Sequence, residues 1–286
     1  MVLCVRPVKG LALPAVLAAL LATPGCVDIV GADFDKYVER DEKHFAVTGT
    51  PDVTLATFDG SIEIRPWDKP DVQVVIEKRG RDKDDVAALE VKAEQTGNHI
   101  EISVTEPQRD RGAFNIHFTS RSAKLIVSVP ASSNVAARSG DGSIDIERVT
   151  GHVQLRSGDG SIRGRMLGGD VDANTGDGSI RLDGKLTSVR VRTGDGSVTI
   201  RAESGSAPSA DWDIVTGDGS VTIEVPDGFG AELDAHTGDG GIHMQDVTLS
   251  NVTGNVGKNS LRGRLGAGGR AVRVRTGDGS ITLKRS

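Results

Sequence analysis

The tetrapeptide Gly-Asp-Gly-Ser, followed by Ile or Val, recurs along the second half of this chain of 286 residues. Successive copies are separated by 18, 18, 18, 23, 21 and 39 residues. A recurring unit of this length is typical of repeat architectures, in which each copy forms one structural unit that stacks on the next. The first glycines of the copies are Gly140, Gly158, Gly176, Gly194, Gly217, Gly238 and Gly277, and the copy at Gly238 carries Gly241 in place of the serine.

Two weaker relatives of the motif extend this series. The segment 257–261 reads Gly-Lys-Asn-Ser-Leu and divides the last interval into 19 and 20 residues. We therefore expect it to be a degenerate copy of the motif that forms a rung of its own. The segment 58–62 reads Phe-Asp-Gly-Ser-Ile and lies far upstream. With these relatives, the series covers most of the chain.

Apolar residues alternate on both sides of each copy, which is the pattern of half-buried strands. Val189 and Val191 precede one copy, and Val198 and Ile200 follow it. Thr193 and Val198 both belong to the inward columns, although they are an odd number of residues apart, so the intervening Gly-Asp-Gly must bend the chain. We expect glycine to supply a positive φ at this corner and the aspartate to hydrogen-bond its own backbone.

These columns predict an all-β fold, a single-stranded parallel β-helix of about eight rungs over 131–286. At about 4.8 Å per strand, eight rungs make a rod of roughly 38 Å. Period-two stretches also predict an N-terminal β region at 46–130, with a short helix near 82–89 and a loop at 106–115. Aromatic residues make up only 3% of the chain, which suits a narrow core built from Val, Ile and Leu.

The N-terminus has the pattern of a secretory signal peptide. Arg6 and Lys9 precede an apolar run over 10–22, which is shorter than the roughly 20 residues that a membrane-spanning helix needs. We therefore predict a signal peptide at 1–25 and a tether at 26–45. The sequence Leu-Ala-Thr-Pro-Gly-Cys ending at Cys26 resembles the lipobox of bacterial lipoproteins, although Thr and Pro depart from the usual pattern. Lipidation at Cys26 is the prediction, and ordinary cleavage nearby is the alternative.

Charge and motif content argue against several classes of function. The formal net charge is −6 without a basic stripe, so we expect no nucleic-acid partner. No nucleophile triad, phosphate loop or zinc motif stands out, and we predict that the protein is not an enzyme. A carbohydrate-active β-helix enzyme is one alternative, with the insertion 202–214 as its site, where Glu203, Asp211 and Asp213 flank Trp212. A plain surface bulge is the other interpretation of that insertion.

The aspartate of each copy is the candidate metal ligand. Stacked rungs would bring these carboxylates into one column, and carboxylate oxygens bind calcium. The competing interpretation is a turn residue partly neutralised by Arg138, Arg156, Arg192 and Arg275, which stand three positions earlier. We expect His236 and His243, on either side of one turn, to be surface residues rather than a metal pair. No cofactor other than calcium is predicted, and the candidate ligands are Asp141, Asp159, Asp177, Asp195, Asp218, Asp239 and Asp278.

The segments Asp-Gly-Ser-Ile-Glu-Ile-Arg-Pro-Trp, Val-Ser-Val-Pro-Ala-Ser-Ser-Asn-Val and the Thr-Gly-Asp-Gly-Ser rungs resemble the bacterial putative-adhesin family of β-strand-repeat domains over 46–286. The resemblance implies a secreted or lipid-anchored envelope protein and transfers no catalytic residue. We expect a non-catalytic, adhesin-like or scaffolding lipoprotein held at a membrane by its lipid. Its partners would be an envelope protein or a surface polysaccharide.

The last strand, which begins near Ile281, has no obvious cap after it. We expect it to be an open final rung, and an open strand edge can pair with another chain. End-to-end self-association of the rod is therefore a further expectation.

Overall fold

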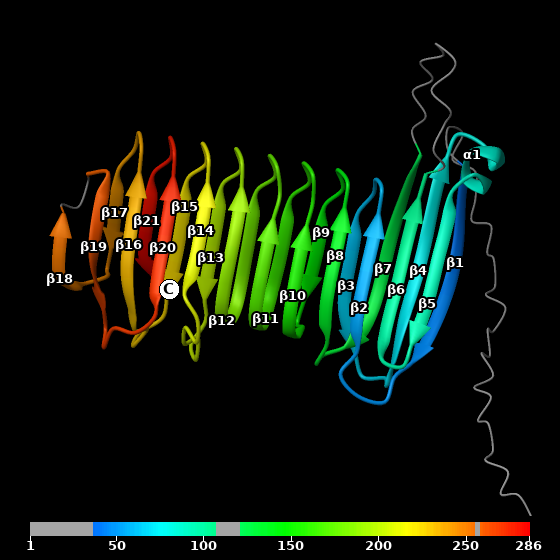
Figure 1. Cartoon of the computed structure of the whole chain (residues 1–286), viewed down its shortest axis with the longest axis horizontal. Coiled ribbons are helices and arrows are strands. Elements are labelled where there is room, and N and C mark those ends of the chain that lie inside the picture. The colour runs from blue at the N-terminus through cyan, green and yellow to red at the C-terminus, as the bar shows by residue number, and fades with distance from the viewer. Residues whose placement is uncertain (1–36, 107–120, 255–257) are drawn as a thin grey trace, which may run out of the picture.

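The computed structural model describes residues 37–106, 121–254 and 258–286. Within these ranges the chain is all-β, with one short helix, α1 (Lys83–Ala87), where a helix was predicted. The strands form two layers that face each other along a rod (Figure 1). The predicted signal peptide, Cys26 and the predicted loop at 106–115, except for Glu106, lie outside the described residues.

The first layer begins at the N-terminal end of the rod with an antiparallel pair and continues through the strands that precede each corner. In spatial order it contains β5 (Glu90–Thr96), β6 (His99–Thr105), β2 (Asp52–Thr57), β8 (Asn134–Ser139), β10 (Thr150–Arg156), the second halves of β11 (Ile162–Asn174) and β12 (Ile180–Thr193), β14 (Trp212–Thr216), β20 (Ala271–Thr276), β16 (Ala231–Thr237), β19 (Ser260–Leu265) and β18 (Leu249–Gly254).

The second layer begins at the N-terminal end with the antiparallel strands β1 (Tyr37–Ala46), β4 (Asp71–Gly80) and β7 (Ser122–Pro130) and continues through the strands that follow each corner. In spatial order it contains β1, β4, β7, β3 (Ile62–Trp67), β9 (Ile144–Glu147), the first halves of β11 and β12, β13 (Val198–Ala202), β15 (Val221–Val225), β21 (Ile281–Arg285) and β17 (Ile242–Gln245).

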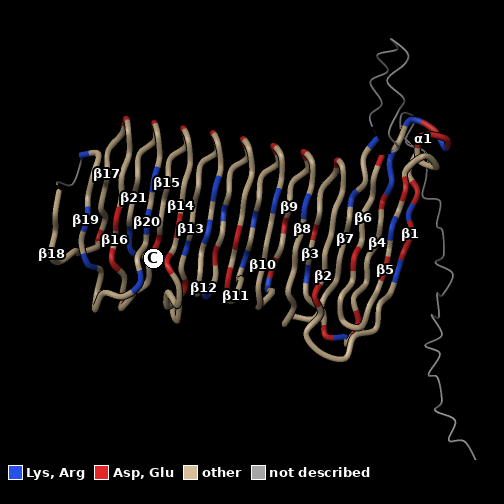
Figure 2. The backbone as a smooth tube through the Cα atoms, in the orientation of Figure 1, with Lys and Arg blue, Asp and Glu red and all other residues tan. Residues whose placement is uncertain are grey.

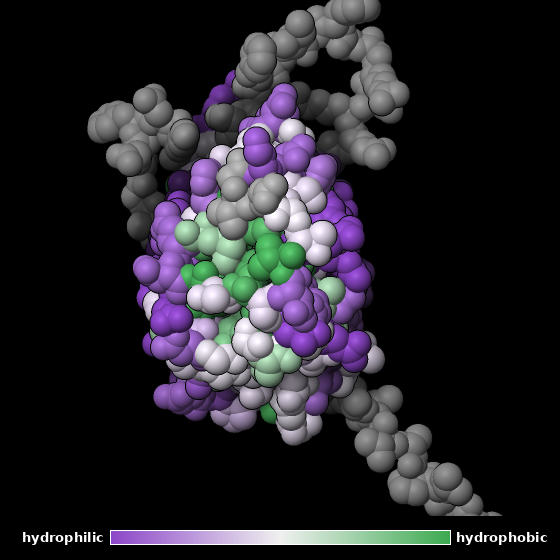
Figure 3. Space-filling view, turned by 90° about the vertical axis from the view of Figure 1, so that its left-hand side faces the viewer, coloured by the Kyte–Doolittle hydropathy of each residue, from purple (hydrophilic) through white to green (hydrophobic). Residues whose placement is uncertain are grey.

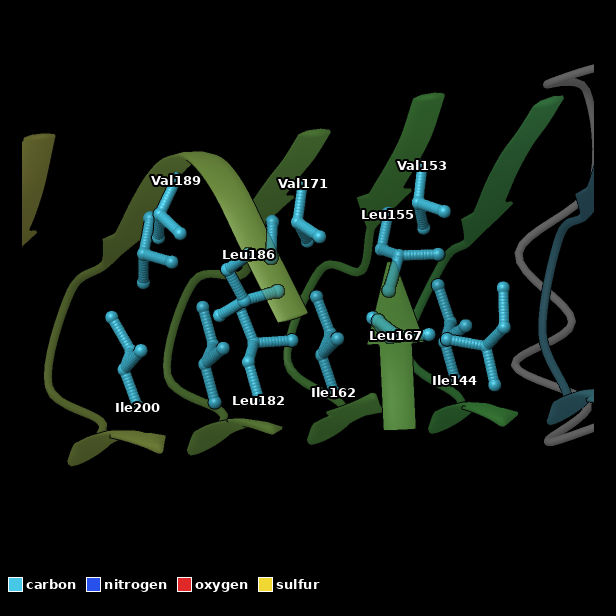
Figure 4. Packing of buried hydrophobic residues seen from close by; sticks show 14 of the residues in the cluster. Ile144, Val153, Leu155, Ile162, Leu167, Val171, Leu182, Leu186, Val189 and Ile200 are labelled. Carbon is cyan, nitrogen blue, oxygen red and sulfur yellow. The ribbon is translucent and has the colours of Figure 1, made fainter. Parts of the chain in front are cut away.

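The core lies between the two layers as continuous columns of like side chains. Val153, Val171 and Val189 of the first layer stack in register and face Ile144 and Ile162 of the second layer (Figure 4). All of them are at most 2% exposed. Each buried aliphatic side chain of this kind contributes about 1.5–3 kcal/mol relative to its exposed state. The predicted inward columns are therefore confirmed.

The N-terminal region is continuous with the repeats. Strands β2 and β3 flank the upstream relative of the motif and pair in parallel with β8 and β9. The predicted tether is wrong from Tyr37 onward, because β1 starts there and pairs antiparallel with β4. Charged residues occupy much of this edge strand, and both of its faces are partly exposed, so the alternation that identifies a half-buried strand is missing.

The segment 257–261 does not form a parallel rung. Its last two residues, Ser260 and Leu261, begin β19, which pairs antiparallel with β16 and with β18. Asn259 occupies the place of the second glycine of the motif, and Leu261 can face the core in either strand direction. The degenerate copy therefore adds an antiparallel strand to the first layer.

The rung that comes last in the sequence is an internal one. Strand β20 lies between β14 and β16, and β21 lies between β15 and β17. The prediction of an open final strand at Ile281 is therefore wrong. Val274 lies between Ile214 and Ala235, and its apolar side chain would suit the inward column next to any rung. The apolar pattern therefore predicts that this rung joins the stack, but it does not predict the order of the rungs.

Candidate functional site

The Gly-Asp-Gly-Ser turns stack into one corner that runs along the rod, and this corner is the candidate site. Backbone N–H groups of the first glycines donate to the first-glycine carbonyl of the neighbouring rung, as in Gly217 to Gly194 (2.6 Å) and Gly238 to Gly277 (2.8 Å). The rungs follow the order of the chain as far as Gly217, and the copies at Gly277 and Gly238 then follow in reversed order. The corner is therefore hydrogen-bonded along the stacking direction.

A buried hydroxyl precedes each turn and holds it to the neighbouring rung. The Thr193 hydroxyl, for example, donates to the Gly178 carbonyl at 2.9 Å. These side chains are 8% exposed or less, so an unpaired polar group there would be costly. The same bond joins Ser139 to Gly60 (2.8 Å), Ser157 to Gly142 (2.9 Å), Thr175 to Gly160 (2.9 Å), Thr216 to Gly196 (2.9 Å), Thr276 to Gly219 (2.8 Å) and Thr237 to Gly279 (2.7 Å).

The glycines of the motif are required by close approach between rungs. The expected positive φ is wrong, because none of the glycines in the seven copies lies in the left-handed region, whereas Gly60 of the upstream relative has φ 131°. A Cβ on Gly178 would lie less than 3.0 Å from the Gly160 carbonyl, and the second glycine of every copy meets a carbonyl of the neighbouring rung in the same way. Any side chain at this position would force two rungs apart.

The seven aspartates form an exposed row along the corner, which we call the aspartate ridge (Asp141, Asp159, Asp177, Asp195, Asp218, Asp239 and Asp278). The ridge follows the tips of the turns along one edge of the rod (Figure 2). Five of the carboxylates lie close to the first glycine of an adjacent rung; a Cβ on Gly158, for example, would lie 2.9 Å from Asp141 Oδ1. The lack of a side chain at the first glycine therefore leaves room for the carboxylate.

The predicted neutralisation of the ridge by arginines is wrong. Arg192 pairs with Asp213 (2.6 Å) and Arg275 pairs with Asp234 (2.9 Å), both on neighbouring strands of the first layer. In the part of the chain that the structure describes, no salt bridge or side-chain hydrogen bond involves a ridge carboxylate. Strand residues pair across the ladder, and the three-residue offset directs the arginine and the aspartate to different surfaces.

Electrostatic coupling is visible where the ridge continues into the upstream relative of the motif. Desolvation by burial raises the pKa of Asp59, and the charges of Asp141 and Glu106 raise it further. No group of three or more His, Cys, Asp or Glu residues within 37–106, 121–254 and 258–286 is arranged to hold a metal ion. Calcium binding by the ridge stays a prediction.

The two histidines are not brought together as a pair. His236 lies on β16 of the first layer, in register with Arg275, and is exposed. His243 lies on β17 of the second layer, in register with Thr282, and is exposed as well. Both histidines are surface residues, as expected.

The insertion at 202–214 does not assemble the acids that the enzyme alternative requires. Asp211 accepts hydrogen bonds from the Ala271 N–H (3.1 Å) and from Arg273 (2.9 Å), which lower its pKa, whereas Asp213 pairs with Arg192. Trp212 is fully buried, with its ring 5.4 Å from that of Phe229. The tryptophan therefore belongs to the core and offers no platform for a sugar.

Two buried carboxylates at the N-terminal end escaped the sequence analysis. Arg81 (3.0 Å) and Arg121 (2.6 Å) hydrogen-bond to Asp85 and lower its pKa to about 2. Burial raises the pKa of Glu77, but hydrogen bonds from Arg79 and Arg40 outweigh this effect and hold the pKa below its usual range. Arg40 and Arg121 come from other segments of the chain, Arg81 lies four residues before Asp85, and Arg79 is two residues from Glu77 on the same strand. Pairs at such short spacings are common on exposed strands and turns, so they gave no signal of buried charge. The buried hydroxyls could have been found from the sequence, because a Ser or Thr recurs at one position of an otherwise apolar column.

The solved structures that the comparison found have low similarity to this chain. They include a "putative cell adhesion protein" from Clostridium sporogenes (13% identity, 86% of this chain and 100% of that chain, TM-score 0.38), a "putative adhesin" from Bacteroides fragilis (11%, 86% and 97%, 0.33) and a "putative lipid binding protein" from Parabacteroides distasonis (11%, 86% and 96%, 0.31). A comparison with curated proteins finds no match. Among the described residues, no helix is long and apolar enough to span a membrane.

One family model covers most of the chain. It is the Toastrack model DUF4097, which matches residues 52–284 and thus includes every copy of the corner motif. The family resemblance predicted from the motif is confirmed. By this match, and by the stacked corner that the motif builds, the chain belongs to the Toastrack family DUF4097.

Proposed function

We propose that this protein is a non-catalytic, adhesin-like or scaffolding lipoprotein of the bacterial cell envelope, which presents the outer faces of a parallel β-solenoid of about eight rungs. The proposal rests on the role of the repeated residues, most of which join neighbouring rungs. The buried hydroxyls and both glycines of each copy hold one rung to the next, which leaves the aspartate as the only exposed, charged member of the motif. A motif used in this way favours a rigid support rather than a reaction centre.

The outer faces support the same proposal because their charges are paired across rungs. Arg165 contacts Glu147 at 3.0 Å, and Lys284 contacts Glu224 at 2.9 Å. Exposed pairs of this kind add little stability, but they make a flat surface of mixed charge. Such a surface suits recognition of a polar partner, which we take to be an envelope protein or a surface polysaccharide.

Attachment to a membrane is the second part of the proposal, with Cys26 as the lipid-bearing residue. Strand β1 starts at Tyr37, so a lipid at Cys26 would hold the N-terminal end of the rod closest to the membrane. Several acyl chains on one cysteine give stable anchoring, whereas one chain is marginal. We expect Cys26→Ala to abolish labelling by a fatty-acid probe and to move the protein out of the membrane fraction, while Cys4→Ala leaves both unchanged. Membrane association that persists in Cys26→Ala would contradict the anchor.

Adhesion without catalysis can be tested with beads that carry the chain. We expect the beads to retain envelope polysaccharide without release of shorter sugars or unsaturated ends. Release of such products that is lost in Asp211→Asn or Asp213→Asn would establish the carbohydrate-active alternative instead. Failure to bind both polysaccharide and envelope proteins would argue against an adhesive role.

Calcium binding is the second candidate function. The aspartate ridge favours it, because exposed carboxylates without a basic partner among the described residues stand in register along the corner. Calorimetry with calcium tests this candidate directly, alongside the melting curve.

A further inference from the structure

The two ends of the rod expose strand edges of different character. At the N-terminal end the edge strands are β1 and β5, which include Glu39, Arg40, Glu42, Glu90 and Lys92. Charged residues on an edge strand discourage pairing with another chain. At the opposite end, which we call the far end, the last strands are β17 in the second layer and β18 in the first. Neither β17 nor β18 contains a charged residue.

Strand β17 also has main-chain groups that no described residue uses. Within the described residues it pairs with β21 alone. The Ile242 N–H donates to the Lys258 carbonyl (3.2 Å) and therefore points away from β21. Alternate residues of a parallel strand face the same neighbour, so Met244 directs its N–H and carbonyl to the same outer side. No hydrogen bond to these two groups occurs within 37–106, 121–254 and 258–286.

Apolar side chains gather on the far end. Met244, Val247 and Leu249 pack against the core but are only partly buried, and Val252 is 49% exposed. The view onto this end shows a hydrophobic patch surrounded by polar residues (Figure 3). An apolar patch with a polar rim is typical of an interaction surface.

The far end is stepped. The first layer continues beyond β16 with β19 and β18, whereas the second layer ends at β17. The end therefore has an overhang of two strands beside an edge that no described strand covers. If a two-fold axis placed a second copy against it, the overhang of each chain would cover the β17 edge of the other.

We propose that the far end is a self-association surface and that its occupant is a second copy of this chain, joined tail to tail through β17 and the β18–β19 overhang. When the far ends of two chains are in contact, uncharged edges and apolar patches face each other, and no like charges are opposed. Head-to-tail stacking would instead place the charged strands β1 and β5 on the apolar patch. A two-fold contact uses the same patch on both chains and closes, so it yields a dimer and no filament. A contact confined to one end of a rod belongs to the class of small interfaces, so we expect the dimer to be reversible.

Sedimentation velocity of the full chain tests the proposal. Cys4→Ser and Cys26→Ser in the background exclude lipid and native disulfides. We expect a dimer that appears as the concentration rises to about 100 µM, in the range of weak transient interfaces. Met244→Pro removes an outward N–H that β21 does not use, and Val252→Lys places a charge in the patch. Each is expected to weaken the dimer at least tenfold, whereas Thr96→Lys on the opposite end leaves it unchanged.

A cross-link makes the test independent of folding defects. An equal mixture of Val252→Cys and Met244→Cys chains in the same background is expected to give a disulfide-linked dimer of one chain of each kind on mild oxidation, because the overhang of one chain covers β17 of the other, and Thr96→Cys is expected to give none. A chain that stays monomeric at every concentration overturns the proposal. So does a dimer that survives both Met244→Pro and Val252→Lys, or one that forms through Thr96→Cys instead.

Discussion

The repeat stack and the N-terminal end of the rod hold their strands together by different means. In the stack, buried hydroxyls and glycines join parallel rungs through uncharged groups, as between Thr193 and Gly178. At the N-terminal end, Asp85 and Glu77 tie antiparallel strands and α1 together through buried charges. Parallel rungs of equal shape can reuse one corner, whereas antiparallel strands at an end each need their own contacts. The stack should therefore respond to steric changes and the N-terminal end to pH.

The largest expected effect is steric and belongs to the stack. In Gly178→Ala the new Cβ meets the Gly160 backbone, which cannot move without separating two rungs. We expect a loss of about 3–5 kcal/mol in the free energy of unfolding, at the upper end for single substitutions. Urea unfolding measures it, with Gly49→Ala as the control, because a Cβ on Gly49 meets only the Asn98 side chain. Equal effects in the two variants would show that close approach is not the role of the motif glycine.

The next effect belongs to the N-terminal end. Asp85→Asn removes the charge that Arg81 and Arg121 share, and we expect a loss of about 2 kcal/mol, as for hydrogen bonds to charged groups. The pKa of Asp85 is lowered in the folded state to about 2 from 3.8. Its contribution is therefore fully present above about pH 4 and is lost as the pH falls towards about 2.

Hydrogen exchange of β4 and β7 as a function of pH separates this effect from the stability of the stack. Protection should decrease there first on acidification in the native protein, and the decrease between about pH 4 and 2 should be smaller in Asp85→Asn. If β10 and β12 lost protection together with β4, the contrast between the two regions would not hold.

The hydroxyl column predicts a smaller loss within the stack. Thr193→Val keeps the shape but leaves the Gly178 carbonyl without its donor, and we expect a cost of about 1–2 kcal/mol. Thr199→Val, on the outer side of β13, is the matched control and should change stability by less than about 0.5 kcal/mol. If Thr193→Val left the free energy of unfolding unchanged, the hydroxyl column would contribute by packing alone and not by its hydrogen bonds.

The smallest effect concerns the aspartate ridge. Replacing Asp177 and Asp195 by Asn should raise the melting temperature at low salt by about 1–2 °C and reduce its dependence on salt, because like charges are removed. We expect calcium and magnesium to shift the native midpoint equally at matched ionic strength. A calcium-specific shift that disappears in the double variant would establish the metal site predicted from the sequence.

The fold was largely predictable from the sequence because its inward columns recur with a fixed period. Val189 and Ile200, for example, lie where the alternation places them. The place of β20 and β21 was not predictable, since the same column residues fit any pair of neighbouring rungs. The sequence led us to expect a positive φ at the motif glycines, whereas they are required because a carbonyl of the adjacent rung lies against them. A turn motif alone does not reveal this neighbour. Buried ion pairs such as Asp85–Arg121 join residues far apart in sequence and leave no local pattern.

The insertion of β20 and β21 between earlier rungs has a consequence for the order of assembly. Rungs up to β14 and β15 can be added as they are synthesised, each onto the previous one. Strands β16 and β17 lack the neighbours that join them to the earlier rungs until β20 and β21 have been made, roughly 2–8 s later at typical elongation rates of about 5–20 residues per second. The nascent chain therefore carries an unfinished apolar segment for seconds. A chaperone acting during synthesis or export would find its binding site there.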